Sequence, residues 1–131
     1  MPFTLQVVKA SDFVRLDATG KPDLFKSRKA LEALAEECCK RGVDCALLDI
    51  RESQGRLSLA DLYYLIMAFP DMGFRQDHRM AVLHRYNEGE RAEFFAMCAN
   101  QRGWTVRAFD TFEDAMGWFN EQSGVSDTSG G

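Results

Sequence analysis

The residues best suited to chemistry follow a buried-looking apolar run in the middle of the chain. Asp49, Arg51 and Ser53 come directly after the run that starts at Val43, and Ser58 precedes a new apolar stripe. A carboxylate, a guanidinium and two hydroxyls in this order can recognise a polar or charged partner. They do not form a nucleophile with an adjacent base, so the stretch favours recognition over catalysis.

Two further polar groups stand at the ends of later apolar runs. His84 and Arg85 follow Met80 to Leu83, and Asp110 follows Trp104 to Phe109. His84 could act as a general base, but no serine or cysteine is identifiable as its nucleophile, and no G-x-S-x-G motif exists. A small enzyme using His84 is therefore the weakest functional alternative.

The four cysteines favour neither a metal site nor redox chemistry. Cys38 and Cys39 are adjacent, and neither Cys45 nor Cys98 completes a CxxC spacing. Free thiols in a reducing cytoplasm account for all of them, and Cys98 sits at a core helical spacing. We expect no metal and no cofactor.

Size and charge exclude several function classes. With 131 residues the chain suits one domain, which we place at residues 1–121. A net charge of −4 argues against binding to nucleic acid, which needs a basic face. No apolar run approaches the ~18 residues of a membrane span, and no signal-peptide pattern opens the chain. We expect a cytoplasmic protein.

The apolar patterns predict strands and helices in alternation. Residues 3–8 and 13–18 alternate apolar and polar positions, as in an antiparallel hairpin. A helical stripe over 23–41 ends at Gly42, and 43–50 reads as a strand covered on both faces. The remaining predicted elements are a loop over 51–57, a helix from Ser58 stopped by Pro70, a connection over 71–77, a strand over 80–83, a helix from Asn87, a strand over 104–109, a helix from Asp110 or Thr111, and a disordered tail over 122–131.

This order predicts an α/β fold with a mixed, mostly parallel sheet of about five strands and about four helices. In such sheets ligands and partners meet the carboxyl ends of the parallel strands. The candidate binding residues at that edge are Asp49, Arg51, Ser53, Ser58, His84, Arg85 and Asp110. Structural roles stay open for them: Asp49 could equally cap local backbone donors, the arginines could be ion-paired, and Ser58 could serve as a helix cap.

Three segments carry a resemblance to a known family: ALLDIRE, RMAVLH and ANQRGWTVRAFDTFEDAMGWF. Over residues 3–119 the chain resembles the SpoIIAA-like branch of the STAS superfamily, whose fold is related to the CRAL-TRIO lipid-binding domains. Regulatory members carry an Asp-Ser-Ser-Gly motif with a phosphorylated serine. Ser53 and Ser58 lie in the corresponding region but in a different context. The resemblance implies a non-enzymatic domain that works by binding.

Two binding functions follow. The first is a regulatory or adaptor domain that binds a protein partner at the strand ends, with Ser58 as the candidate phosphorylation site. The second is the binding of a small apolar or amphipathic, lipid-like molecule under the 58–69 helix and the 70–77 connection. A homodimer through Met72 and Phe74 of that connection is compatible with both.

Overall fold

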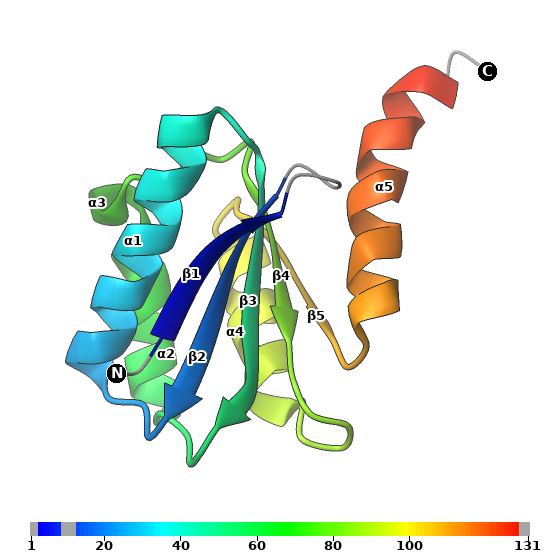
Figure 1. Ribbon diagram of the computed structural model, residues 1–131. Coiled ribbons are helices and arrows are strands. Elements are labelled where there is room, and N and C mark those ends of the chain that lie inside the picture. Colours follow the sequence, from blue (N-terminus) through cyan, green and yellow to red (C-terminus); the bar gives the residue numbers. More distant parts are fainter. Residues whose placement is uncertain (1–2, 9–12, 129–131) are drawn as a thin grey trace.

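A sheet of four parallel strands, with one antiparallel strand at its edge, forms the centre of the molecule (Figure 1). The computed structural model describes residues 3–8 and 13–128, with side chains described for 13–121. The strands follow one another across the sheet in chain order. They are β1 (Phe3–Val8), β2 (Phe13–Gly20), β3 (Cys45–Ser53), β4 (Arg79–Leu83) and β5 (Thr105–Phe109). The predicted hairpin and the mostly parallel sheet are confirmed.

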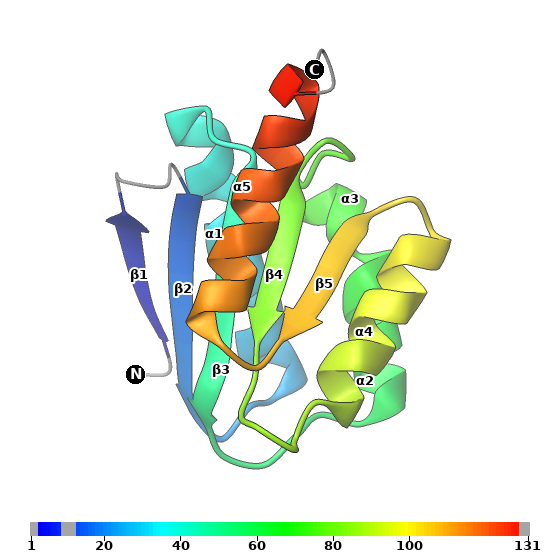
Figure 2. The same cartoon turned by 90° about the vertical axis from the view of Figure 1, so that its right-hand side faces the viewer.

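The helices form two layers of unequal size. They are α1 (Leu24–Arg41), α2 (Leu59–Met67), α3 (Phe69–Met72), α4 (Glu90–Gln101) and α5 (Phe112–Thr128). Since the parallel strands are added in one direction, right-handed crossovers place every connecting helix on the same face. Figure 1 shows α1 to α4 on that face, and Figure 2 shows α5 alone across the other.

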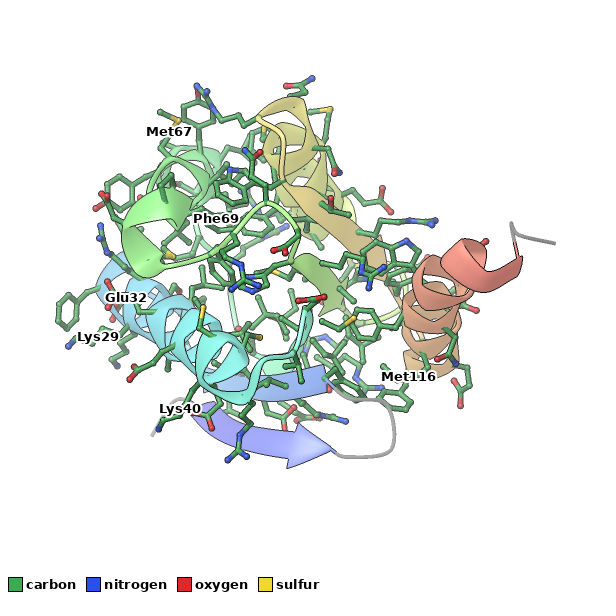
Figure 3. The ribbon with its side chains drawn as sticks, turned by 90° about the horizontal axis from the view of Figure 1, so that it is seen from above. Lys29, Glu32, Lys40, Met67, Phe69 and Met116 are labelled. Carbon is green, nitrogen blue, oxygen red and sulfur yellow. The ribbon has the colours of Figure 1, made fainter. Side chains whose placement is uncertain are left out.

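The sheet therefore separates two apolar clusters. The larger packs α1, α2 and α4 on the sheet and includes Leu16, Leu34, Ile66 and Phe95. The smaller lies under α5. Its buried members include Phe13, Leu47, Leu83, Trp118 and Phe119. Seen from above in Figure 3, Phe69 points inward, whereas Lys29, Glu32 and Lys40 lie on the outer side of α1.

The described part of the chain contains five helices, where about four were predicted. Pro70 does not simply stop α2, because it stands in the first turn of α3, where its missing N–H costs nothing. α3 then ends at Gly73, whose φ of 102° favours glycine. Met72 and Phe74 are buried, with 6% and 7% of their surface exposed, so these two side chains pack in the core and do not form an exposed apolar surface. A homodimer stays a prediction.

Two element boundaries also differ from the prediction. β3 continues to Ser53, so Arg51 lies in a strand and the loop starts at residue 54. α4 starts at Glu90 after Gly89, and Asn87 adopts a φ of 65° in the preceding turn. Asn87 is tolerated there because a short polar side chain accepts the left-handed region more readily than most.

The chain beyond residue 121 continues as backbone of α5 to Thr128. The predicted disordered tail covers residues 122–131. The side chains of all these residues, and the backbone from residue 129, lie outside the described part of the structure, so the disordered tail stays a prediction. Among the described helices, none has the length and apolar character needed to cross a membrane.

Candidate functional site

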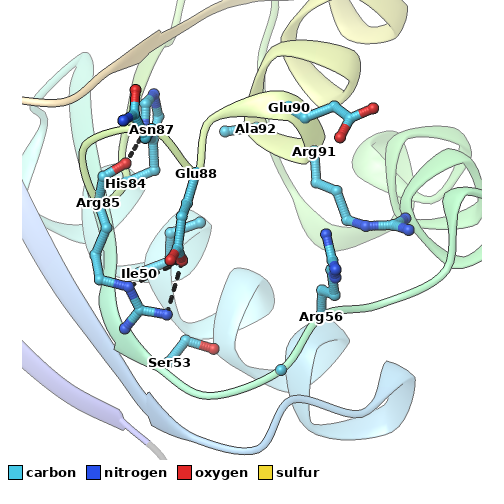
Figure 4. Close-up of a pocket in the computed structure, with 11 residues that line it drawn as sticks. Ile50, Ser53, Arg56, His84, Arg85, Asn87, Glu88, Glu90, Arg91 and Ala92 are labelled. Atoms are coloured by element: carbon cyan, nitrogen blue, oxygen red, sulfur yellow. Dashed lines mark hydrogen bonds and ion pairs between the residues drawn. The ribbon is translucent and has the colours of Figure 1, made fainter.

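A cavity of about 420 Å³ opens at the carboxyl ends of β3 and β4 (Figure 4). Its walls are the loop at 54–58, the loop at 84–89 and the first turn of α4. This volume falls within the ~300–1,000 Å³ that small-molecule sites span. Three of the predicted site residues, Ser53, His84 and Arg85, line it together.

An irregularity in β3 turns Ser53 toward this cavity. Asp17 of β2 pairs with Asp49, but Thr19 pairs with Glu52, so β3 holds one extra residue between these pairs. Such a bulge reverses the alternation of side chains along the strand. Asp49 and Ser53 would otherwise share a face. The bulge instead leaves Asp49 on the α5 side and brings Ser53 to the cavity.

His84 is buried at the end of β4 and lines the cavity. Its Nδ1 lies 2.8 Å from the carbonyl oxygen of Arg85, which can only accept, so Nδ1 carries the hydrogen. In the neutral ring Nε2 therefore has a lone pair. No described serine or cysteine is hydrogen-bonded to the ring, so the arrangement has an acceptor but no activated nucleophile.

Gly89 makes the position of His84 feasible. A Cβ atom at residue 89 would lie 2.4 Å from Cε1 and 2.6 Å from Nε2 of His84. Real Cβ atoms do not approach ring atoms this closely, so any larger residue would displace the imidazole or the loop. The sequence offered no signal for this role beyond a glycine between two glutamates.

Arg85 is held by its own loop and by the neighbouring strand. Its guanidinium forms an ion pair with Glu88 at 3.0 Å and donates to the carbonyl oxygen of Arg51 at 2.7 Å. The side chain thereby ties the 84–89 loop to the end of β3. The predicted ion-paired role of Arg85 agrees with this geometry, although the pair is solvent-exposed and contributes little stability by itself.

Asp49 and Arg51 lie on the opposite face of the sheet and do not line the cavity. Asp49 is buried, and its carboxylate accepts hydrogen bonds from Arg51 and from Arg15 of β2. Burial alone raises the pKa of Asp49, but the hydrogen bonds and charge of Arg51, with the charge of Arg15, outweigh it, so the pKa lies below 3.8. The same contacts raise the pKa of Arg51. The ion pair of Asp49 and Arg51 therefore connects residues within the sheet and does not form part of the cavity.

The last two predicted residues lie apart from each other. Ser58 is the N-cap of α2: its Oγ accepts a hydrogen bond from the backbone N–H of Asp61 at 3.0 Å. Asp110 is half-buried in the turn between β5 and α5. Thr111, rather than Asp110, caps α5 by accepting from the backbone N–H of Asp114. Neither Ser58 nor Asp110 lines the cavity.

A smaller apolar hollow of about 150 Å³ lies next to the first, beneath α2 and the loop that precedes it. Leu31 from α1, Leu62 and Leu65 from α2, and Phe95 from α4 line it. The two hollows share Ser53, Gly55, Arg56 and Arg91, among other residues, at their boundary. No residue of the 70–77 connection contributes to it.

One group of metal-ligating types occurs among the described residues, at the opposite end of the sheet. It consists of Asp44, Asp77 and His78, whose nearest ligand atoms lie within 4.8 Å of one another. Arg75 already pairs with both carboxylates, at 3.7 and 3.1 Å, and its backbone N–H donates to Nδ1 of His78. The guanidinium of Arg75 therefore already compensates the charge of the two carboxylates, as a bound cation would.

Comparisons with known proteins extend the fold description. No family model and no curated protein matches the chain. An uncharacterised protein from Shewanella loihica, of the DUF3478 family, superposes with a TM-score of 0.58. It shares 23% identity and covers 89% of this chain and 91% of its own, and it is described as having a SpoIIAA-like fold.

The fold is SpoIIAA-like. An anti-sigma factor antagonist from Mycobacterium paratuberculosis gives a TM-score of 0.59 at 14% identity, covering 90% of this chain and 94% of that one. The anti-sigma factor antagonist SpoIIAA, in its unphosphorylated form, gives 0.52 at 16% identity, covering 86% and 91%. The resemblance found in the sequence is thus confirmed at the level of fold.

Proposed function

We propose that this protein is a non-catalytic regulatory or adaptor domain that binds a protein partner at the carboxyl-end edge of its sheet. The observation that carries the proposal is a set of exposed apolar side chains on that edge. Phe25 in the first turn of α1, Leu59 at the start of α2 and Tyr86 in the 84–89 loop are 70%, 47% and 74% exposed. We call these three the rim residues.

Two of the three rim residues are aromatic. Aromatic side chains are enriched in protein interfaces relative to the rest of the surface. Tyr86 is the residue after Arg85, which lines the cavity, and Leu59 follows the Ser58 cap, so each of these apolar side chains has a polar neighbour in the chain. Similarity of fold to two anti-sigma factor antagonists adds support for a protein-binding role.

Affinity capture tests the proposal, with Tyr86→Asp and Leu59→Asp as variants. Both side chains are exposed, so the substitutions should leave the melting temperature unchanged while reducing recovery of a partner from the native host at least about tenfold. Met97→Asp is the matched control, because Met97 is also half-exposed but lies in the middle of α4. Equal recovery with all three variants would refute the proposed surface.

We further propose Ser58 as a phosphorylation site of this domain. Its side chain is exposed at the N-terminus of α2, where the helix dipole favours added negative charge. Ser53, the other serine in this region, is half-buried beside the cavity. Phosphopeptide mapping of protein from its native host should find the phosphoryl group on Ser58, and a group found on Ser53 instead would overturn the assignment.

A second candidate function, binding of a small apolar or amphipathic molecule, is supported by the apolar hollow. At about 150 Å³ it has room for a group of benzene size and not for a long acyl chain. Native mass spectrometry of freshly purified protein should then show a co-purified mass that Leu62→Trp, which fills the hollow, removes. Purely apo spectra from protein made in several hosts would count against this function.

A further inference from the structure

We propose that the boundary between the two hollows is a binding site for a small oxyanion, a phosphate or carboxylate group, held by Arg56 and Arg91. The proposal rests on a pair of guanidinium groups that form no ion pair with any described residue, and it does not depend on the protein-binding proposal. In Figure 4 the side chain of Arg56 rises from the loop toward the guanidinium of Arg91.

Among the described residues, the guanidinium of Arg91 forms one hydrogen bond and no ion pair. Its Nη1 donates to the carbonyl oxygen of Leu57 at 2.9 Å, which brings the guanidinium beside the loop that carries Arg56. Its Nε is buried and has no hydrogen-bond partner among the described residues. The guanidinium of Arg91 thus keeps donors that the described part of the protein does not satisfy.

Arg56 supplies the second guanidinium. It forms no hydrogen bond or ion pair with any described residue, and its side chain is exposed at the cavity mouth. Two like charges in one cavity repel each other, and an oxyanion between them would convert this repulsion into two charge-assisted pairs. Arginine suits the task because its planar fork matches carboxylate and phosphate oxygens.

The other groups around the cavity agree with an anion as ligand. Three arginines and two glutamates line it, and Glu88 is already paired with Arg85. One positive charge is therefore in excess, in a protein whose net charge is −4. Arg91 and Ala92, which line the cavity, belong to the first turn of α4, where the N-cap Gly89 makes no side-chain hydrogen bond and the helix dipole favours negative charge.

The site also has an apolar wall, which would distinguish between two classes of anionic ligand. Ile50 and Ala92 line both hollows, and the apolar hollow continues past Arg91 beneath α2. An inorganic or sugar phosphate would use the arginines alone. A carboxylate with a short apolar chain would also fill the apolar hollow, where each buried CH₂ adds to the affinity.

Titrations followed by amide NMR test the proposal on the intact protein, with sodium phosphate, acetate and hexanoate as probes and sodium chloride as the reference. We expect saturable shifts at Arg56, Arg91 and Ala92 for phosphate or hexanoate. Saturation by phosphate alone identifies a phosphate site. Hexanoate binding at least about tenfold tighter than acetate identifies an amphipathic carboxylate site.

Two variants decide whether the arginines form the site. Arg56→Gln removes an exposed side chain without described partners, so folding should be unaffected and affinity for the bound probe should fall about tenfold. Arg102→Gln, an exposed arginine at the far end of α4, should leave affinity unchanged. Shifts that match those in chloride, or an Arg56→Gln variant that binds as well as the parent, would overturn the proposal.

Discussion

The guanidinium of Arg51 donates hydrogen bonds to both carboxylate oxygens of Asp49, two residues earlier in the same strand. Nε of Arg51 lies 3.1 Å from Oδ1 of Asp49, and Nη2 lies 2.9 Å from Oδ2. The backbone N–H of Arg51 also donates to Oδ1, at 3.0 Å. Arg15 approaches from β2 at 2.7 Å, so a buried carboxylate is compensated by two guanidinium groups. This arrangement keeps β2 and β3 in register beside the bulge.

The Asp49→Asn substitution should lower the free energy of unfolding by about 2 kcal/mol, since a neutral amide cannot replace the charge-assisted hydrogen bonds that the buried carboxylate accepts from Arg15 and Arg51. Urea denaturation followed by circular dichroism measures the change. Asp17→Asn is the control, because Asp17 contacts only Arg15 of the two and its side chain is 27% exposed. Its effect should be about 1 kcal/mol or less, and equal effects would show that Asp49 has no special role.

The contribution of Asp49 should also depend on pH in a defined direction. Its pKa in the folded protein is below the ordinary 3.8, so the folded state holds its proton less tightly than the unfolded state. The stabilisation is fully present above pH ~4 and is lost as the pH falls through the folded pKa. The stability difference between the parent and Asp49→Asn should therefore be constant from pH 7 to about 5 and shrink below 4. A difference that grows on acidification would contradict the assignment.

Gly89→Ala should lower stability by about 2 kcal/mol, because the new Cβ would overlap the ring of His84. Gly117→Ala is the matched control: nothing lies within 4 Å of a Cβ at that helical position. There alanine should raise stability by about 0.5–1 kcal/mol. In a His84→Ala background the Gly89→Ala cost should fall below about 0.5 kcal/mol. Thermal denaturation of the parent, the two single variants and the double variant completes the cycle.

The four cysteines should differ sharply in reactivity. No disulfide joins them, Cys38, Cys45 and Cys98 are buried, and Cys39 is exposed. Burial raises the pKa of the Cys38 thiol from 9.0 to about 12, so it holds almost no thiolate near neutral pH. Brief treatment with iodoacetamide at pH 8, followed by peptide mass spectrometry, should label Cys39 in the folded protein and all four cysteines in urea. Labelling of Cys38 at the rate of Cys39 would contradict the core packing of α1.

Ser58 should behave as a helix cap whatever else it does. Ser58→Ala should cost about 1 kcal/mol, since the backbone N–H of Asp61 loses its acceptor. Ser58→Asp preserves an acceptor and should stay within about 0.5 kcal/mol of the parent. A chemical denaturation curve for each variant is sufficient. Loss of partner capture in Ser58→Asp, with stability retained, would then separate the binding role of this residue from its capping role.

Much of the fold could be predicted from the sequence, because the patterns that specify strands, helices and helix ends are local. Alternating residues predicted the β1–β2 hairpin, and a continuous apolar run predicted the buried β3 strand. Gly42 and Ser58 predicted the end of α1 and the start of α2. Parallel strands then had to bring Ser53, His84 and Arg85 to one edge, and the cavity lies there.

The tertiary structure alone decided which polar residues face the cavity. Asp49 and Ser53 have the same parity along β3, and only a bulge, set by pairing with β2, sends them to opposite faces. Arg56 and Arg91 are far apart in the chain, and their approach depends on how α4 packs beside the loop before α2. Gly89 matters because of a ring five residues earlier. These relationships depend on contacts between elements, and periodicity along a single chain does not encode them.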